Sequence, residues 1–387
     1  MVVFPDSPAG RRVRWLLDAW SRDGVDQAEA SENLAPTFTF NRFSTGGTLL
    51  DPHVRQAWLD SPRPTVKEVV AESPRLVCTL LESADGSAAW HGFLVEEEPP
   101  HRLTLNVGLD AVDDGGAGGS SATMQVGAVG RAAHLVDDEP HVLHDELAKV
   151  FLSPEYHVRL PVEPRRGPVA MVAVIRARLA EDVVEAAYAR GGRQYVLLGA
   201  GLDSFAYRRT DLTGLRVFEV DEPVSQAWKR DRLRQVGIDE PPDLTFVPVD
   251  FDTQRLDEQL LAAGFDPRQP AAFSLLGVSM FIGTEALAQT LRMVAACPGN
   301  EIAFDYNSDA IATDGDRLLQ AVVRRASEPM VSLYEPDEIE RLLKSCGLEL
   351  VDDLSPADAT RRYLAGRPDG LAVSGRTRCV HARAPLT

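Results

Sequence analysis

The chain has 387 residues, of which 44% are hydrophobic and 25% are charged, a balance typical of a globular protein with about two domains. Its formal net charge of −18 would repel nucleic acid and anionic membrane surfaces, and no apolar run approaches the ~20 residues that a membrane-spanning helix needs. The expected partner is therefore a small molecule or another protein surface.

The cysteines are too far apart in the sequence to form a CxxC zinc or redox pair: Cys78, Cys297, Cys346 and Cys379. We expect them to be reduced, and we predict no metal site. The first residues, MVVFPDSPAG, lack the basic start and long apolar core of a signal peptide. We therefore expect a cytoplasmic protein.

The N-terminal part begins with an amphipathic helix, whose apolar face is formed by Val13, Leu16, Leu17 and Trp20. A second helical stretch is expected at 25–34. Four β-rich runs follow, at 65–72, 75–83, 88–97 and 102–109, and Asp85-Gly86 indicates a tight turn between two of them. Helices followed by an antiparallel meander predict an α+β domain over residues 1–111.

This order of elements, with the ending VEEEPPHRLTL, resembles the small cone-shaped domains of the polyketide cyclase/ketosteroid isomerase superfamily. The resemblance covers about 100 residues and implies a curved sheet wrapped on helices. It carries no catalytic residue over. His91 and His101 are the titratable candidates, and we expect both to be structural or surface histidines.

Residues 112–125, VDDGGAGGSSATMQ, are rich in Gly and Ser and are predicted to be a flexible linker. The second domain, 126–387, would begin with a helical cap interrupted at Pro140. A long amphipathic helix follows at 167–192, with an inward face of Met171, Val174, Ile175, Leu179 and Val183, and it is expected to stop at Gly191-Gly192.

From Gln194 onward, short apolar runs alternate with helical ones. Strands are expected at 195–198, 215–220, 244–249, 272–276, 301–305, 348–352 and 378–381. Helices are expected between them, at 224–236, 255–263, 284–296 and 336–345. Continuous apolar strands that alternate with helices predict an α/β fold, a parallel sheet covered on both faces.

Gly199 and Gly201 follow the first of these strands, in LLGAGLDS. Ligands of open parallel sheets bind at the carboxyl ends of the strands, and glycine lets the backbone approach them in an unusual conformation. The NAD fingerprint needs a third glycine where this chain has Ser204. The loop therefore indicates a nucleotide-type ligand without a pyrophosphate.

Two acids extend this site to the next strands. Asp221 ends the second strand, where a carboxylate accepts both ribose hydroxyls, and Glu219 on the same side is an alternative. Asp250 ends the third strand and would accept the exocyclic amine of an adenine, with Phe251 packed on the ring. A grip on ribose and adenine without a pyrophosphate loop favours S-adenosylmethionine over NAD.

Longer segments extend the pattern: RQYVLLGAGLDSFAYRR, RVFEVDEPVSQAWKRDRL, FVPVDF, FSLLGVSMFI, an upstream SSATMQVGAVGRAAHLVDDEPHVLHDELAKVFL and a tail RYLAGRPDGLAVSG. Over roughly residues 120–383 they resemble the leucine carboxyl methyltransferase family, in particular its actinobacterial small-molecule branch. The resemblance implies a Rossmann-like class I methyltransferase sheet of seven strands, the last antiparallel.

The resemblance also implies roles for individual residues. Gly199 and Gly201 would line the methionine part of the cofactor. Asp221 would hold the ribose, and Asp250 with Phe251 the adenine. Arg176 stands where the family has an arginine that pairs with the cofactor's carboxylate, and the neighbouring Arg178 is the alternative.

The chain departs from the family pattern at a few positions. Leu276 and Phe281 stand where a strand-four glutamate and a tyrosine are usual, and Glu146 replaces a proline after Asp145. These departures weaken any transfer of substrate specificity but leave the cofactor residues intact.

The expected activity is methyl transfer from S-adenosylmethionine to an oxygen of a small molecule. A carboxylate acceptor is favoured because it is ionised at pH 7 and needs no general base, and no catalytic residue is identified. A hydroxyl or amine acceptor would need one, and the cap offers His134, His141, His144 and His157. Asp305 and Tyr306, at the end of the fifth strand, are candidate substrate contacts.

The N-terminal domain would serve substrate capture or dimerisation, which makes a homodimer one candidate assembly. Three alternatives stay open. The chain could be a bifunctional enzyme whose N-terminal domain isomerises or cyclises a substrate, or a non-catalytic cofactor-binding protein. The third alternative, an NAD-dependent oxidoreductase, is disfavoured by Ser204.

Overall fold

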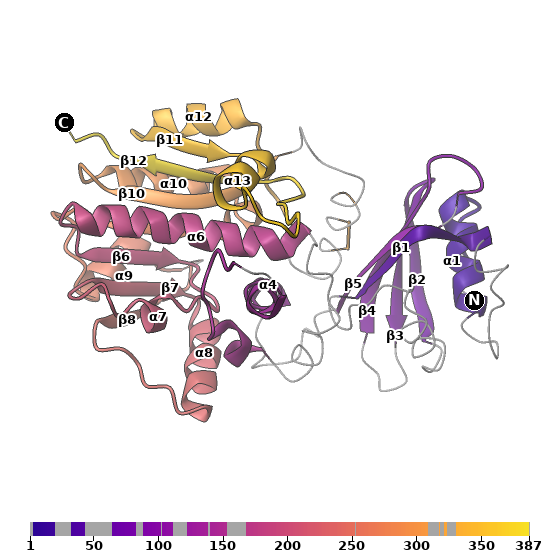
Figure 1. Cartoon of the computed structure of the whole chain (residues 1–387), viewed down its shortest axis with the longest axis horizontal. Coiled ribbons are helices and arrows are strands. Elements are labelled where there is room, and N and C mark those ends of the chain that lie inside the picture. The colour runs from indigo at the N-terminus through magenta and orange to yellow at the C-terminus, as the bar shows by residue number, and fades with distance from the viewer. Residues whose placement is uncertain are drawn as a thin grey trace. The chain divides into compact units, whose positions relative to one another are not determined.

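The structure, a computed structural model, describes residues 3–19, 32–42, 64–82, 88–101, 103–110, 122–137, 140–152, 168–251, 253–308, 317, 321–322 and 330–386. The chain divides into two compact units. The first holds Met1–Gly115, together with Pro154–Pro164 and Ala312–Met330, and the second holds the rest. Each unit has its own sheet (Figure 1).

The first unit is a five-stranded sheet with a helix on one face. The strand order is β1 (Leu34–Arg42), β5 (Leu103–Asp110), β4 (Ala88–Val95), β3 (Leu76–Glu82) and β2 (Thr65–Ser73). The strands β2 to β5 form the predicted antiparallel meander. Helix α1 (Pro8–Ala19) packs Val13, Leu16 and Leu17 against Val77 and Phe93 of the sheet.

Strand β1 is absent from the sequence-based prediction. It pairs parallel with β5 at the edge of the sheet and contains Pro36. Proline cannot donate a ladder hydrogen bond, so it is tolerated in edge strands, and its presence hides a strand from pattern reading. The predicted helical stretch at 25–34 lies mostly outside the described residues. The resemblance of this unit to the cyclase superfamily stays a prediction.

The second unit is a seven-stranded sheet with the order β11-β12-β10-β9-β6-β7-β8. Its strands are β6 (Gln194–Leu198), β7 (Arg216–Asp221), β8 (Leu244–Pro248), β9 (Ala272–Leu275), β10 (Glu301–Asn307), β11 (Glu349–Leu354) and β12 (Thr377–Arg383). The first five are mutually parallel, and β12 is antiparallel to both of its neighbours. The predicted sheet with an antiparallel last strand is confirmed.

The point where the chain order reverses is β6. The chain runs from β6 through β7 to β8 on one side, then continues on the other side of β6 with β9 and β10. In an open α/β sheet this switch point is where ligands bind, beyond the carboxyl ends of the strands. The glycine loop after β6 occupies that place.

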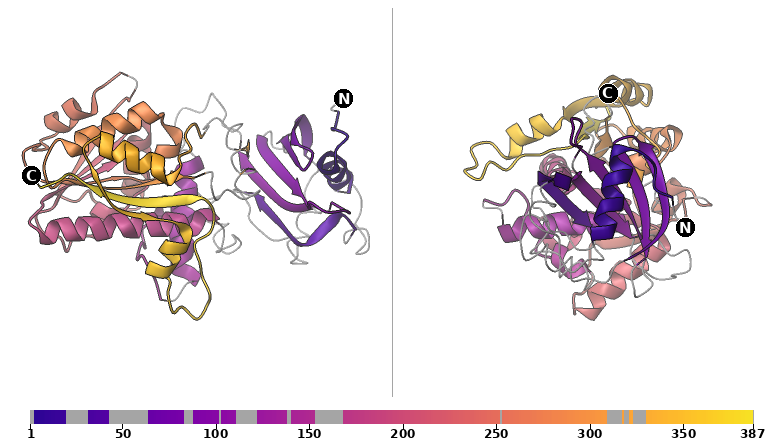
Figure 2. Two further views of the ribbon diagram at one scale, coloured as in Figure 1. Left: turned by 90° about the horizontal axis from the view of Figure 1, so that it is seen from above. Right: turned by 90° about the vertical axis from the view of Figure 1, so that its right-hand side faces the viewer.

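Helices cover both faces of this sheet (Figure 1 and Figure 2). One face packs against α9 (Leu256–Ala262), α10 (Thr284–Ala295) and α12 (Pro336–Ser345). The other packs against α6 (Pro168–Ala189), with α13 (Pro356–Tyr363) on the same core and α7 (Phe205–Arg208) near the glycine loop. The remaining elements are α4 (Ala122–Asp137), α8 (Pro223–Gln235), and the 3₁₀ turns η1 (Ala148–Phe151) and η2 (Ser279–Phe281).

The long helix α6 has the predicted inward face. Its five predicted core residues are all at most 3% exposed. The helix ends where the glycine pair was expected: Gly191 has φ +98°, and the N–H of Gly192 donates to the carbonyl of Ala187 at 2.9 Å. A left-handed glycine satisfies the last carbonyls without steric cost.

Helix α4 begins at Ala122, so the segment predicted as a linker, 112–125, ends in helix, and residues 112–121 lie outside the described residues. No helix in the described part of the chain is both long and apolar enough to span a bilayer.

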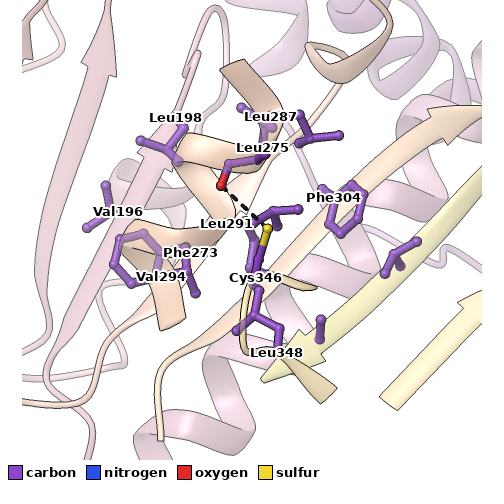
Figure 3. Packing of buried hydrophobic residues seen from close by; sticks show 14 of the residues in the cluster. Val196, Leu198, Phe273, Leu275, Leu287, Leu291, Val294, Phe304, Cys346 and Leu348 are labelled. Atoms are coloured by element: carbon purple, nitrogen blue, oxygen red, sulfur yellow. Dashed lines mark hydrogen bonds between the residues drawn. The ribbon is translucent and has the colours of Figure 1, made fainter. Parts of the chain in front are cut away.

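The largest core lies between β6–β10 and helices α9, α10 and α12. Figure 3 shows Leu287, Leu291 and Val294 of α10 pointing at Phe273 and Phe304, with the thiol of Cys346 donating to a backbone carbonyl of α10. This packing closes one face of the sheet and so fixes the strand tips.

Removing the side chain of Leu291 should therefore destabilise the second unit. Leu291 is fully buried, and Leu291→Ala is expected to cost about 2–5 kcal/mol of unfolding free energy, from lost burial and a residual cavity. The control is Leu261→Ala in α9, where the side chain is 51% exposed. Urea titration of both variants checks this, and equal effects would contradict the described core.

Candidate functional site

The glycine loop leaves β6 in a left-handed conformation. Gly199 has φ +67° and Gly201 has φ +49°, a region where most side chains are strained. A Cβ at position 199 would lie 2.6 Å from Cγ2 of Val278, and one at position 201 would lie 3.5 Å from Cγ of Met124. The loop thus runs between the segment after β9 and helix α4, with no room for a side chain at 199.

Backbone hydrogen bonds tie this loop to the end of β7. The N–H groups of Gly199 and Ala200 donate to the carbonyl of Val220 at 2.9 and 3.0 Å. The N–H of Gly201 donates to Oδ2 of Asp221 at 2.5 Å, and the N–H of Glu222 donates to Oδ1 at 2.8 Å. Asp221 therefore contacts the loop directly.

Burial raises the pKa of the Asp221 carboxyl, while the two N–H donors act in the opposite direction. A carboxylate oxygen has more than one lone pair, so each oxygen can accept a further donor such as a ribose hydroxyl.

A network of buried ionic groups also holds the glycine loop, and the sequence analysis did not predict it. Asp145, 1% exposed, accepts from Oγ of Ser204 at 2.5 Å and from Nε of Arg131 at 2.7 Å. Nη2 of Arg131 donates to the carbonyl of Leu202 at 2.6 Å, and Nε of Arg208 donates to Ser204 at 2.7 Å.

Burial works against ionisation of Asp145, but Arg131 and Arg208 hold its pKa below the ordinary value. Ser204, which occupies the position of the third glycine of an NAD loop, thus links Arg208 of α7 to the cap residue Asp145, which Arg131 of α4 contacts directly.

A second buried ion pair lies beneath the loop. Nζ of Lys229 on α8 contacts Oε2 of Glu219 at 2.7 Å and donates to the carbonyl of Asp203 at 2.5 Å, with both side chains at most 1% exposed. Oε1 of Glu219 has no hydrogen-bond partner among the described residues. Burial raises the pKa of Glu219 to about 7. Since Glu219 is buried within the strand, Asp221 is the acid that lies at the loop.

Asp250 lies two residues beyond the end of β8, which neighbours β7. Its Oδ2 accepts from the hydroxyl of Thr253 at 2.7 Å, and its N–H donates to Oε1 of Gln254 at 2.9 Å. Phe251 is 50% exposed. A large exposed aromatic ring beside a carboxylate is suited to a planar heterocycle with an amine.

Arg176 of α6 lies across the sheet from these residues. Its Nη1 is 3.1 Å from Oδ2 of the fully buried Asp305 on β10. The alternative, Arg178, donates instead to Asp182 on its own helix, through Nε at 2.9 Å. Of the two arginines, Arg176 is the one that reaches the strands.

Tyr306 lies on the opposite face of β10 from Asp305. Its ring packs in the apolar core, and its hydroxyl donates to Oδ2 of Asp353 at 2.9 Å. Burial, and then the charge of Asp353, raise the pKa of Tyr306. This geometry gives no support to the predicted substrate contact of Tyr306. Asp305 is likewise engaged, by Arg176 and by the N–H of Gly277 at 2.6 Å.

The histidines considered as bases have structural contacts where they are described. Nε2 of His134 accepts from the N–H of Val142 at 2.8 Å, and the rings of His134, His141 and His144 lie in a row with centroids 5.6 and 5.0 Å apart. His157 lies outside the described residues. In the first unit, His91 is 3% exposed beside Phe93, and Nδ1 of His101 lies 3.1 Å from the carbonyl of Glu96.

The family described as leucine carboxyl methyltransferase matches residues 124–295 of this chain. A protein of Bacillus subtilis (strain 168) named "Putative S-adenosyl-L-methionine-dependent methyltransferase YktD" is 32% identical over 297 residues, which is 68% of this chain and 97% of that protein. A relative of Mycolicibacterium gilvum (strain PYR-GCK) with the same descriptive name is 32% identical over 239 residues, 57% of this chain and 75% of the relative.

Among solved structures, a duf574 family protein from Streptomyces avermitilis MA-4680 is 17% identical with a TM-score of 0.46, covering 69% of this chain and 98% of that one.

The raised pKa of Glu219 allows a pH test of the burial of this side chain beneath the glycine loop. Between the ordinary value of 4.5 and about 7, the folded protein keeps a proton that the unfolded chain has released. This group's contribution to stability therefore falls as pH rises through that interval. The melting temperature of the wild type minus that of Glu219→Gln should decrease from about pH 5 to about pH 8.

Asp145→Asn provides the control. The pKa of Asp145 is lowered from 3.8, so its carboxyl is ionised in both states across this range and the corresponding difference should stay flat. A difference for Glu219→Gln that is flat or increases with pH would contradict the described burial.

Proposed function

Because this chain belongs to the leucine carboxyl methyltransferase family and is an S-adenosylmethionine-dependent methyltransferase, we propose that it methylates an oxygen of a small molecule, with a carboxylate as the acceptor. The observation that carries the site assignment is the direct hydrogen bond from the glycine loop to Asp221. It joins two neighbouring strand tips into one surface at the switch point of the sheet.

The residues at this edge fit S-adenosylmethionine. The absence of Cβ atoms at Gly199 and Gly201 lets the loop backbone, which we call the cradle, pass close to Val278 and Met124, and the carboxylate of Asp221 stands at its rim. In our assignment the cradle receives the methionine part, and Asp221 accepts the ribose hydroxyls. Asp250 and Phe251 receive the adenine, and Arg176 pairs with the carboxylate.

When bound, the cofactor supplies an electrophilic methyl group on a sulfonium. The protein must align the acceptor with that methyl group and exclude water. Two contacts support such shielding: helix α4 passes over the loop at Met124, and Val278 covers it from the β9 side.

A carboxylate acceptor agrees with how the ionisable groups near the loop are engaged. Asp221 accepts from two backbone N–H groups, Asp305 is paired with Arg176, and Nε2 of His134 accepts from the N–H of Val142. An acceptor that is already ionised near pH 7 needs no proton removed by any of them. Leu276, at the family's glutamate position, packs with Ala180 and Val183.

We further propose that the first unit serves substrate capture or dimerisation in a cytoplasmic enzyme. Its inner face is filled by α1, and His91 on that sheet is buried. These features favour a packed interior over a second catalytic pocket.

Gly201→Asp is expected to abolish cofactor binding. Aspartate tolerates left-handed backbone better than most residues, so the fold should survive. Its side chain would however begin 3.5 Å from Cγ of Met124 and would add a negative charge at the residue bound by Asp221, at the proposed ligand site. The control is Gly214→Asp, where φ is +76° and nothing lies within 4 Å of the added Cβ. Calorimetry with S-adenosylhomocysteine should show binding only in the control, and unchanged affinity in Gly201→Asp would refute the site.

The acceptor class can be tested by the chemistry of the product. With methyl-labelled S-adenosylmethionine and a series of carboxylic acids, we expect volatile label to be released by mild alkali, because methyl esters hydrolyse and methyl ethers or amines do not. The pH–rate profile should be flat around neutrality, since no base titrates. Alkali-stable label, or a rate that tracks one ionisation, would contradict a carboxylate acceptor. Asp221→Ala serves as the inactive control.

A further inference from the structure

Arg176 is held on one side by a buried acid. Oδ2 of Asp305 is 3.1 Å from its Nη1, while Oδ1 accepts from the N–H of Gly277 at 2.6 Å. The Asp305 side chain is fully buried, whereas that of Arg176 is 20% exposed. One end of the guanidinium is thus anchored to strand β10, and Nη2 makes no hydrogen bond to any described residue.

Two glycines enclose the same guanidinium. Gly277, just beyond β9, has φ +72°, and a Cβ there would stand 2.6 Å from Nη1 and 2.7 Å from Nη2 of Arg176. A Cβ on Gly127 of α4 would lie 3.5 Å from Nη2. Gly277 precedes Val278, whose side chain packs on the glycine loop. The guanidinium of Arg176 therefore lies in a tight slot beside Gly277, and the next residue, Val278, contacts the glycine loop.

Packing alone does not require an ion pair in this slot. Desolvating two charges costs as much as their attraction returns, and apolar replacements of buried pairs are often neutral or stabilising. What the pair adds is a fixed orientation, since the planar guanidinium can bind one anion through Nη1 and present Nη2 to another.

The position of Asp305 also bears on a departure from the family pattern. Phe304 of β10 pairs with Leu275 of β9, so Asp305 and Leu276 are the next positions on neighbouring strands. Leu276 stands where the family pattern has a glutamate. In this chain the carboxylate at this end of the two strands is therefore Asp305 of β10, and position 276 after β9 has none.

We propose that Asp305 is a positioning residue that orients Arg176 so that Nη2 receives the α-carboxylate of S-adenosylmethionine. This inference rests on the proposed cofactor site and adds how its arginine is held. It predicts that loss of Asp305 weakens only ligands that carry the amino-acid end.

The test compares two ligands on the full-length protein by calorimetry. S-adenosylhomocysteine has the amino-acid end, and 5′-methylthioadenosine shares the adenosyl thioether without it. Asp305→Asn should raise the Kd of S-adenosylhomocysteine about tenfold or more, the size of a lost charged hydrogen bond, and leave that of 5′-methylthioadenosine within about twofold. In an Arg176→Ala background, Asp305→Asn should have no further effect, because the two residues act as one unit.

Two further variants separate positioning from stability. Asp353→Asn removes another acid paired with an arginine, 10% exposed and 2.9 Å from Nε of Arg378, and should lower the melting temperature without changing the ratio of the two Kd values. Arg176→Lys keeps the charge but loses the fork, so it should weaken S-adenosylhomocysteine selectively. This second variant decides the matter if Asp305→Asn does not fold.

The inference is overturned if Asp305→Asn or Arg176→Lys weakens both ligands equally, weakens neither, or if the effect of Asp305→Asn adds to that of Arg176→Ala. A wild-type protein that binds neither ligand would instead overturn the proposed cofactor site.

Discussion

The proposed cofactor site depends on one hydrogen bond, from the backbone N–H of Gly201 to the carboxylate of Asp221 at 2.5 Å. It fixes the glycine loop after β6 against the end of β7, where the order of the sheet reverses. The left-handed φ angles of the loop and the contact with Val278 leave little freedom for another path. The acid assigned to the ribose and the backbone assigned to the methionine are consequently positioned by a single contact.

Buried charges beneath and beside the loop reinforce this arrangement. Lys229 links Glu219 to the carbonyl of Asp203, and Arg131 links Asp145 to the carbonyl of Leu202. Such pairs stabilise a fold weakly because desolvation offsets their attraction. Their contribution is to hold two successive loop carbonyls in fixed positions, which prepares the cradle before a ligand arrives. The Arg176–Asp305 pair likewise holds a side chain, the guanidinium of Arg176, in a fixed position.

Much of this was predictable from local sequence pattern. Every predicted strand of the second unit lies within about two residues of an observed one, since buried parallel strands read as continuous apolar runs. The choice between Asp221 and Glu219 could not be predicted from the sequence, because it depends on Lys229 reaching Glu219 from α8. The Arg131–Asp145–Ser204 network was invisible since its members are distant in sequence. The sequence alone could have predicted that Tyr306 and Asp305 point to opposite faces of the sheet, because successive side chains of a strand alternate.

The proposed site holds an adenosyl sulfonium across the tips of β6, β7 and β8. The most direct measurement is a crystal structure of the protein with S-adenosylhomocysteine. We predict the ribose hydroxyls on the carboxylate of Asp221, the sulfur beside Gly199 and Gly201, and the adenine against Phe251. Density for the ligand at any other place on the sheet, or none at saturating concentration, would contradict the account.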